Sequence, residues 1–143
     1  MARVQIESPQ MWLFHTKLTV RVGDINYGGH LGNDRVLGLA HEARVRWLAS
    51  HNFSEADVGG AGLIMADAAL VFRREAFLGD VLDVALGAAE VRRSSFDLIY
   101  LLTRPADGAE IALVKTGMVC FDYTAHKVVR LPQGLAHCLG SVA

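Results

Sequence analysis

The second half of the chain is organised as four long apolar segments with short breaks between them. Each segment is rich in Val, Leu, Ile, Phe and Ala, which is typical of β-strands, and the breaks carry the Gly, Pro, Asp and Ser residues of tight turns. The strands are predicted at residues 63–77, 81–92, 96–104 and 110–123, and the breaks at residues 78–80, 94–95 and 105–108. Because the links between consecutive strands are short, we expect an antiparallel meander. A further short strand is expected at residues 128–131, where Pro132 ends it.

One helix is predicted before these strands. From Asp34 to about Ser50 the apolar side chains recur at helical spacing and no proline interrupts them. These apolar positions are Val36, Leu37, Ala40, Ala43, Trp47 and Leu48. A helix of this length is about 25 Å long. One early helix followed by a run of strands is an α+β arrangement, in which the sheet wraps around the helix.

Composition limits the class of protein. A length of 143 residues suits one domain with a single core, so we expect one domain over residues 1–143. The hydrophobic fraction of 52% and the charged fraction of 20% suggest that part of the surface is hidden in an oligomer. The net charge of −1 gives no general electrostatic case for binding nucleic acid or an anionic membrane.

The sequence predicts neither secretion nor membrane insertion. The apolar patch at residues 11–14 lacks the flanking features of a signal peptide, and no apolar stretch approaches the roughly 20 residues of a membrane-spanning helix. Cys120 and Cys138 have no metal-ligand or redox-motif spacing and fit a reducing compartment. The histidines show no zinc-ligand spacing, and the G-x-S-x-G motif of serine hydrolases is absent. We therefore expect a cytoplasmic protein with no metal and no cofactor.

Polar chemistry is concentrated between a strand predicted at residues 18–22 and the helix. This stretch, residues 24–33, reads D-I-N-Y-G-G-H-L-G-N. Its two adjacent glycines permit a sharp bend, and its last residue or the next one can cap the helix, whose N–H groups would point back towards Asn26 and His30. A strand, bend and helix start of this kind can hold a developing oxyanion beside a general base. The alternative is an ordinary turn in which His30 is a partly exposed loop residue.

The same stretch resembles the first strand, bend and helix of a known family. D-I-N-Y-G-G-H-L-G-N-D followed by H-E-A-R is similar to the motif D-x-D-x-x-G-H-V-N-N with a later E-x-A-R, which is common in the hotdog-fold acyl-CoA thioesterases of the hydroxybenzoyl-CoA thioesterase type. Asn26 stands where the second, catalytic Asp of that motif usually stands. The plant acyl-carrier-protein thioesterases are similar in carrying D-x-N before a nearby histidine, so an Asn at this place also occurs in active enzymes.

The resemblance covers roughly residues 17–132, because later segments such as G-D-V-L, E-V-R-R-S-S-F and F-D-Y fall where that family places similar residues. It implies a hotdog fold, an antiparallel sheet wrapped around one long central helix, as a single thioesterase-like domain. It also implies hydrolysis of an acyl-CoA or acyl-carrier-protein thioester to free acid and thiol. The expected assembly is a homodimer, with dimers pairing into a homotetramer.

Thioester hydrolysis requires an activated water, or a carboxylate nucleophile, and donors for the carbonyl oxygen. Because an amide cannot act as a base, we expect Asn26 to orient the water or the substrate while His30 or Glu42 takes the proton. Backbone N–H groups at Gly32 and Asn33 are expected to hold the oxyanion.

Two further acids are candidates. Asp24 is expected to support the bend or to orient Asn26, with a purely structural, turn-initiating role as the alternative. Asp67 is a candidate substrate contact and belongs also to the second hypothesis, an acyl-thioester-binding or dehydratase-like hotdog protein without thioesterase activity. Dehydratases of this fold pair a histidine with an acid from another element, as His30 with Glu42 or Asp67 could do.

Two arginine pairs are candidates for anion binding. Arg92 and Arg93 end a predicted strand before a tight turn, and in thioesterases that the chain resembles, basic residues at this turn hold the phosphates of coenzyme A. Guanidinium groups suit this task because they bind phosphate oxygens in pairs. Arg73 and Arg74 form a second pair. Because side chains alternate along a strand, this pair is expected to place at most one arginine on each face.

Overall fold

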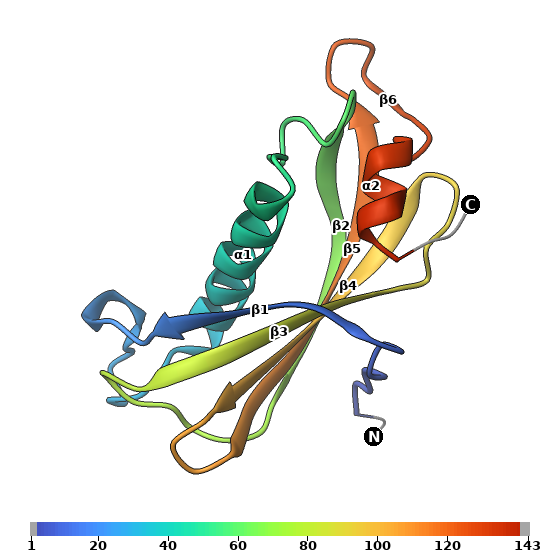
Figure 1. Ribbon diagram of the computed structural model, residues 1–143. Helices are drawn as coiled ribbons and strands as arrows, with labels where there is room; N and C mark the ends of the chain where they lie inside the picture. Colours follow the sequence, from blue (N-terminus) through green and yellow to red (C-terminus); the bar gives the residue numbers. More distant parts are fainter. Residues whose placement is uncertain (1–2, 141–143) are drawn as a thin grey trace.

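A computed structural model gives the fold of residues 3–140, the part of the chain described below (Figure 1). In chain order, its elements are β1 (Trp12–Thr19), the 3₁₀ helix η1 (Val22–Asp24), α1 (Asn33–Ser50), β2 (Gly62–Phe72), β3 (Val81–Ala89), β4 (Ser95–Arg104), β5 (Ala109–Asp122), β6 (Lys127–Val128) and α2 (Gln133–Cys138). The strands of this part of the chain form one antiparallel sheet, which twists strongly and curves around α1 (Figure 1). The α+β class and the hotdog arrangement expected from the sequence are confirmed.

The core lies between α1 and the sheet. The helix begins at Asn33, one residue earlier than the periodicity predicts, and packs against β1, β3 and β5. Its buried residues are Val36, Leu39, Ala40, Ala43, Arg44, Trp47 and Leu48. Burial of each large apolar side chain contributes about 1.5–3 kcal/mol, so this face fixes the helix on the sheet. Within residues 3–140 neither helix combines the length and the apolar character needed to cross a membrane.

The strand order differs from the expected meander at one connection. The strands lie in the order β1-β3-β4-β5-β2, and β6 pairs with β5. The meander of β3, β4 and β5 is confirmed, but β2 pairs with β5 at the far edge, because β1 occupies the place beside β3. The break at residues 78–80 is therefore not a hairpin turn. Instead, Gly79 donates its N–H to the carbonyl of Val20 (2.9 Å), and Val20 donates to the carbonyl of Asp80 (2.8 Å).

Several element boundaries also differ from those expected. β1 lies earlier than the strand predicted at residues 18–22, and part of that stretch forms η1. β2 ends at Phe72, before Arg73 and Arg74, which were expected inside it, and β3 ends at Ala89, before Arg92 and Arg93, which were expected at its end. β6 is shorter than the strand predicted at residues 128–131, and the unexpected α2 follows Pro132 directly. Both arginine pairs consequently lie in loops, where the alternation of strand side chains does not apply.

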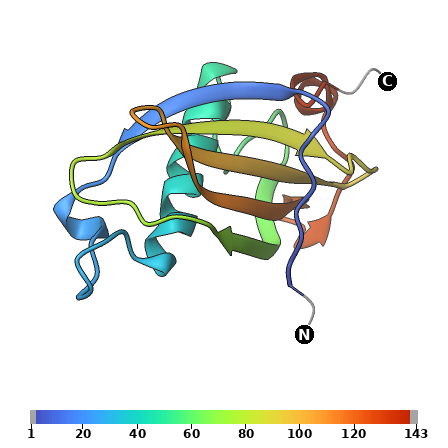
Figure 2. The same ribbon diagram turned by 90° about the horizontal axis from the view of Figure 1, so that it is seen from below.

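The segment before β1 crosses the face of the sheet opposite α1 (Figure 2). Ala85 and Ile99 on that face are buried, with 4% and 3% of their surface exposed. Pro9 passes directly over Gly87, because a Cβ at Gly87 would lie 2.5 Å from Pro9 Cγ. Only a glycine permits this close crossing.

Candidate active site

The bend between η1 and α1 is closed by backbone hydrogen bonds. Gly32 donates its N–H to the carbonyl of Asp24 (2.9 Å), and Asn26 donates its N–H to the carbonyl of His30 (3.0 Å). Gly29 has a φ of 85°, a conformation that favours glycine. The two adjacent glycines of the sequence therefore do form a sharp bend.

Asn26 and His30 converge over the backbone of Gly28. Asn26 Oδ1 accepts the N–H of Gly28 (3.0 Å), so its amide group keeps a fixed orientation. A Cβ on Gly28 would lie 3.3 Å from both Asn26 Oδ1 and His30 Nε2, so the two side chains border the same small space. His30 Nδ1 lies 3.3 Å from the carbonyl oxygen of Leu31. Because a carbonyl can only accept, Nδ1 is the donor in this hydrogen bond, and the tautomer that makes it has Nε2 free to act as a base.

His30 lines a pocket of about 240 Å³ between the bend, the start of α1 and the loop that follows β2. Its polar lining consists of His30, Asn33, Arg73, Arg74 and Glu75, and its apolar lining of Leu31, Val36, Phe72, Ala76 and Ile111. Glu75 Oε1 lies 3.9 Å from His30 Nε2. An apolar wall beside a small group of polar side chains is typical of small-molecule sites.

The N-terminus of α1 borders this pocket, since Asn33, the first residue of the helix, lines it. Gly32 is the N-cap and makes no side-chain capping bond, so the first N–H groups of the helix carry its positive dipole end. The N–H of Gly32 donates to the carbonyl of Asp24. It is therefore already engaged and does not hold the oxyanion, as was expected of it. The N–H groups of Asn33 and Asp34 are left as the candidate oxyanion donors.

Asp24 and Glu42 lie outside the pocket of His30. Asp24 has 9% of its surface exposed, and its Oδ2 accepts the N–H of Arg21 (2.9 Å), which fits the expected support of the bend. Glu42 pairs with Arg46, whose Nε lies 2.9 Å from Glu42 Oε2. Both acids line a separate groove of about 460 Å³. The expected pairing of Glu42 with His30 is therefore not made within this chain.

The other expected substrate contacts also lie away from this pocket. Asp67 on β2 accepts a hydrogen bond from Lys115 Nζ (2.7 Å), and this bond lowers the pKa of Asp67. Arg92 pairs with Glu90, with Nη2 2.8 Å from Oε2. Arg92 and Arg93 follow β3 at the end opposite the bend (Figure 1). One copy of the chain does not bring this arginine pair to His30.

Arg73 and Arg74 line the pocket together, which corrects the expectation of one arginine on each face of a strand. β2 ends at Phe72, and the N–H groups of both arginines then donate to the same carbonyl, that of Ile111, at 2.9 and 3.2 Å. This irregular pairing ends the alternation of side chains. Three consecutive charged residues, ending with Glu75, are the sequence signal that the strand stops here.

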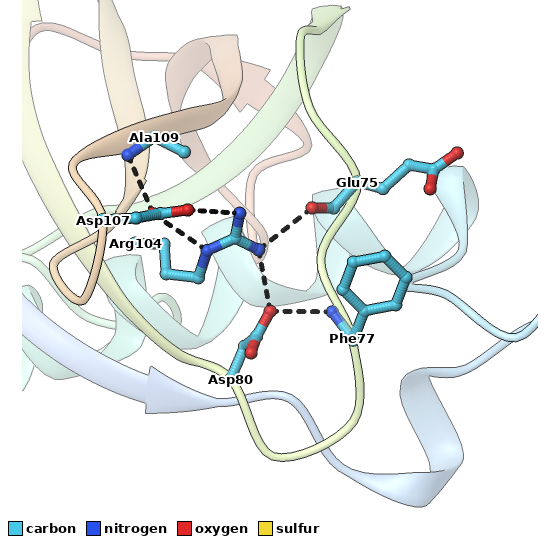
Figure 3. Close-up of polar contacts among 6 residues, drawn as sticks. All are labelled: Glu75, Phe77, Asp80, Arg104, Asp107 and Ala109. Atoms are coloured by element: carbon cyan, nitrogen blue, oxygen red, sulfur yellow. Dashed lines mark hydrogen bonds and ion pairs between the residues drawn. The ribbon is translucent and has the colours of Figure 1, made fainter.

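Arg104 at the end of β4 holds the β2–β3 loop, residues 73–80 (Figure 3). Its Nη1 donates to the carbonyl of Glu75 (3.1 Å) and to Asp80 Oδ2 (2.9 Å). Its Nε and Nη2 donate to the two carboxylate oxygens of Asp107, at 3.0 and 2.9 Å. Asp80 Oδ2 also accepts the N–H of Phe77 (2.9 Å). These hydrogen bonds, above all those to Asp107, raise the pKa of Arg104, so the side chain stays charged.

The β2–β3 loop in turn holds the bend. The carbonyl of Ala76 accepts a hydrogen bond from the N–H of Leu31 (2.8 Å), the residue directly after His30. Arg104 is therefore connected to His30 through the backbone of the loop. Arg104 could not be identified from the sequence, because a lone arginine at a strand end gives no signal of its partners.

A buried arginine ties α1 to the sheet. Arg44, from the H-E-A-R motif, has 5% of its surface exposed and donates to Tyr100 Oη (3.0 Å) and to Glu55 Oε2 (3.0 Å). Tyr100 Oη also bonds Thr116 Oγ1 (2.8 Å). Burial opposes ionisation of Glu55, but the hydrogen bonds from His41 and Arg44 outweigh it and lower the pKa of Glu55. The network fixes the helix whose N-terminus borders the pocket.

A profile described as the thioesterase-like superfamily matches residues 20–139. These residues include the bend, the central helix, the whole meander and all of α2. The chain belongs to the thioesterase-like superfamily. The expected relationship to hotdog thioesterases is confirmed.

Solved structures support the same assignment. The chain is similar to Slr0204, a 1,4-dihydroxy-2-naphthoyl-CoA thioesterase from Synechocystis, with 25% identity, a TM-score of 0.82, and coverage of 90% of this chain and 96% of that one. It shares the fold of BH1999 gentisyl-coenzyme A thioesterase, with 17% identity, a TM-score of 0.77, and coverage of 88% and 99%. It also shares the fold of the dynemicin thioesterase, with 19% identity, a TM-score of 0.78, and coverage of 90% and 97%. None of the curated proteins matches the sequence significantly.

Proposed function

We propose that this protein hydrolyses an acyl thioester of coenzyme A, or of an acyl-carrier protein, to the free acid and the thiol. The observation that carries the proposal is the convergence of Asn26 Oδ1 and His30 Nε2 over Gly28. This convergence lies beside the N-terminus of α1 and a partly apolar pocket. The naphthoyl-CoA and gentisyl-CoA thioesterases of the same fold support coenzyme A as the carrier.

In the proposed mechanism, water is the nucleophile. His30 Nε2 takes a proton from the water as its oxygen attacks the thioester carbonyl, and the N–H groups of Asn33 and Asp34 stabilise the oxyanion. The amide of Asn26 orients the water or the thioester. Collapse of the tetrahedral intermediate breaks the carbon–sulfur bond, and the thiolate takes up the proton held by His30. Asp24 supports the bend, because its carboxylate and its carbonyl are both engaged in hydrogen bonds there.

The test is release of free thiol from a panel of aliphatic and aromatic acyl-CoA thioesters, followed with a thiol reagent. Thiol release that depends on Asn26 and His30 supports the proposal. A wild-type protein that releases no thiol from any CoA or carrier-protein thioester would reject it.

A second candidate is hydration or dehydration of the acyl chain. The distance of 3.9 Å between Glu75 Oε1 and His30 Nε2 favours it, because this is a histidine paired with an acid from another element. Glu75 thereby replaces Glu42 and Asp67 as the candidate acid partner. The test uses an enoyl-CoA as the substrate. Loss of its enoyl absorbance without thiol release would identify this activity.

We further propose a cytoplasmic protein of one hotdog domain that assembles as a dimer, with pairing of dimers into a tetramer. Two features support assembly. β2 is an edge strand in one copy of the chain, and it exposes 41% of Met65 and 47% of Phe72. Arg92 and Arg93 can hold the phosphates of coenzyme A at this site only if they come from a second copy.

A further inference from the structure

The geometry points to a second anion-binding element, formed by Arg73 and Arg74, which holds an anionic group of the thioester substrate beside His30. The inference rests on the proposed function, because it names a substrate contact of the same pocket. Arg74 is the principal contact and Arg73 the second.

Arg73 and Arg74 both line the pocket that contains His30 and Asn33. They also border a neighbouring groove of about 410 Å³, which continues past Asp107 and Glu110 at the β4–β5 turn. The arginine pair therefore separates the space near the reactive residues from an outer groove. A thioester with its carbonyl at His30 passes these side chains if its other end lies in that groove.

The charges around the pair leave one guanidinium for a ligand. Arg73 Nη1 lies 3.0 Å from Glu110 Oε1, and Asp107 is held by Arg104. Within residues 3–140 no acidic side chain forms an ion pair with Arg74. An arginine that is exposed at the mouth of a pocket and has no acidic partner there is suited to a carboxylate or a phosphate, which it can bind with two parallel hydrogen bonds.

The backbone holds the pair in place before any ligand binds. The N–H groups of both arginines are bonded to the carbonyl of Ile111, and the residue that follows them is held by Arg104 through its carbonyl. A fixed backbone lowers the entropic cost of ordering the side chains on binding. The pair is therefore a prepared contact for an anionic group.

Two sources of the anionic group are separated by the choice of substrates. A carboxylate on the acyl group is tested by comparing succinyl-CoA with butyryl-CoA, which share the carrier. A phosphate of the carrier is tested by comparing benzoyl-CoA with benzoyl-pantetheine, which share the acyl group. Arg74→Gln is the test variant, Arg74→Lys the charge-retaining variant, and Arg3→Gln the control, since Arg3 is exposed and lies outside the linings of both pockets.

Arg74→Gln is expected to raise KM by about 10-fold to 100-fold, the scale of a lost hydrogen bond to a charged group, with little change in kcat. An effect confined to succinyl-CoA assigns the acyl carboxylate, and an effect on all CoA thioesters but not on benzoyl-pantetheine assigns the carrier phosphate. Arg74→Lys should recover part of the loss, and Arg3→Gln should match the wild type. Unchanged KM values for every substrate with Arg74→Gln would overturn the inference.

Binding separates this inference from the proposed activity. Calorimetry with hydrolysis-resistant thioether analogues of the same four compounds measures the contact without turnover. If the wild type releases no thiol but binds these analogues more tightly than Arg74→Gln does, the hydrolase proposal fails and the anion site stands. Equal affinity of the two proteins for all the analogues rejects the site whether or not thiol is released.

Discussion

Arg104 Nη1 lies 2.9 Å from Asp80 Oδ2, and this ion pair joins the end of β4 to the far end of the loop that borders the candidate active site. The same carboxylate oxygen accepts the N–H of Phe77, and the same guanidinium holds the carbonyl of Glu75 (Figure 3). The loop is thus fixed at two points on either side of Ala76, whose carbonyl holds the bend. The position of His30 depends on contacts made by strand residues far from it in sequence.

Arg104→Gln is expected to lower kcat/KM by about 10-fold to 100-fold. Without the clamp His30 can shift, and a misplacement of about 1 Å in a reactive group has effects of up to this size. Thiol release measures the rate, and circular dichroism checks the fold. Asp107→Asn serves as the control, since it removes the charge and one acceptor oxygen of the outer contact of Arg104 and leaves the contacts to the loop, and its effect should be smaller. Equal activity of Arg104→Gln and the wild type would show that the loop keeps its position without the clamp.

Asn26→Ala and His30→Ala are each expected to lower kcat by about 100-fold or more, the usual scale for lost general-base or positioning contacts. Asn26→Asp is the sharper test, because it restores the carboxylate that the family motif usually carries. An active Asn26→Asp variant supports a thioesterase site, while an inactive one implies that the amide donates a hydrogen bond that a carboxylate cannot. If all three variants keep the wild-type rate, the bend is only structural.

Replacement of both Arg92 and Arg93 by alanine is expected to raise KM for acyl-CoA far more than it lowers kcat, since a phosphate contact is the same in the ground and transition states. Added salt should raise KM of the wild type more than KM of the variant. Steady-state kinetics at two ionic strengths measures both effects. An unchanged KM would identify these arginines as ordinary loop surface.

Glu55→Gln is expected to destabilise the protein at neutral pH by about 1–3 kcal/mol, the range for hydrogen bonds to charged groups. The pKa of Glu55 is lower in the folded protein than in the unfolded chain, so its ionised form stabilises the fold above the unfolded-state pKa. As pH falls below about 4.3 and passes through the folded pKa, this contribution disappears. Urea unfolding at neutral and acidic pH should show the difference between the two proteins shrinking at low pH. A difference that stays constant with pH would contradict the role of the charge.

Light scattering at micromolar concentration is expected to give at least twice the 15.5 kDa mass of one chain, because the β2 edge and its apolar side chains need a partner. Introduction of a lysine at Met65 should weaken the assembly if this edge forms the contact, since a charge on an edge strand opposes pairing. Met118→Leu, in the buried core, is a control that should keep the mass. A monomer from the wild type would reject the proposed assembly.

Local periodicity was enough to predict α1, the meander of β3 to β5 and the bend, because each depends on residues close together in the sequence. The place of β2 at the far edge could not be predicted this way, since it depends on β1 pairing with β3 across a long separation. The same limit applies to the site. Asn26 and His30 could be proposed from the sequence because they share a motif. Glu75, which lies 3.9 Å from His30, and Arg104, which holds the loop by hydrogen bonds, come near the candidate site only in the tertiary structure.

The strand order β1-β3-β4-β5-β2 puts the two strands that flank α1 in sequence at opposite edges of the sheet. The meander of β3 to β5 pairs neighbours along the chain. The pair β1 with β3 must instead close a loop that contains α1 and β2, and the pair β2 with β5 a loop that contains β3 and β4. Loop closure costs entropy before the new contacts form, so folds with many such contacts fold slowly. We infer that the meander forms early during folding and that the bend and the β2–β3 loop take up their positions late, when both edge strands join.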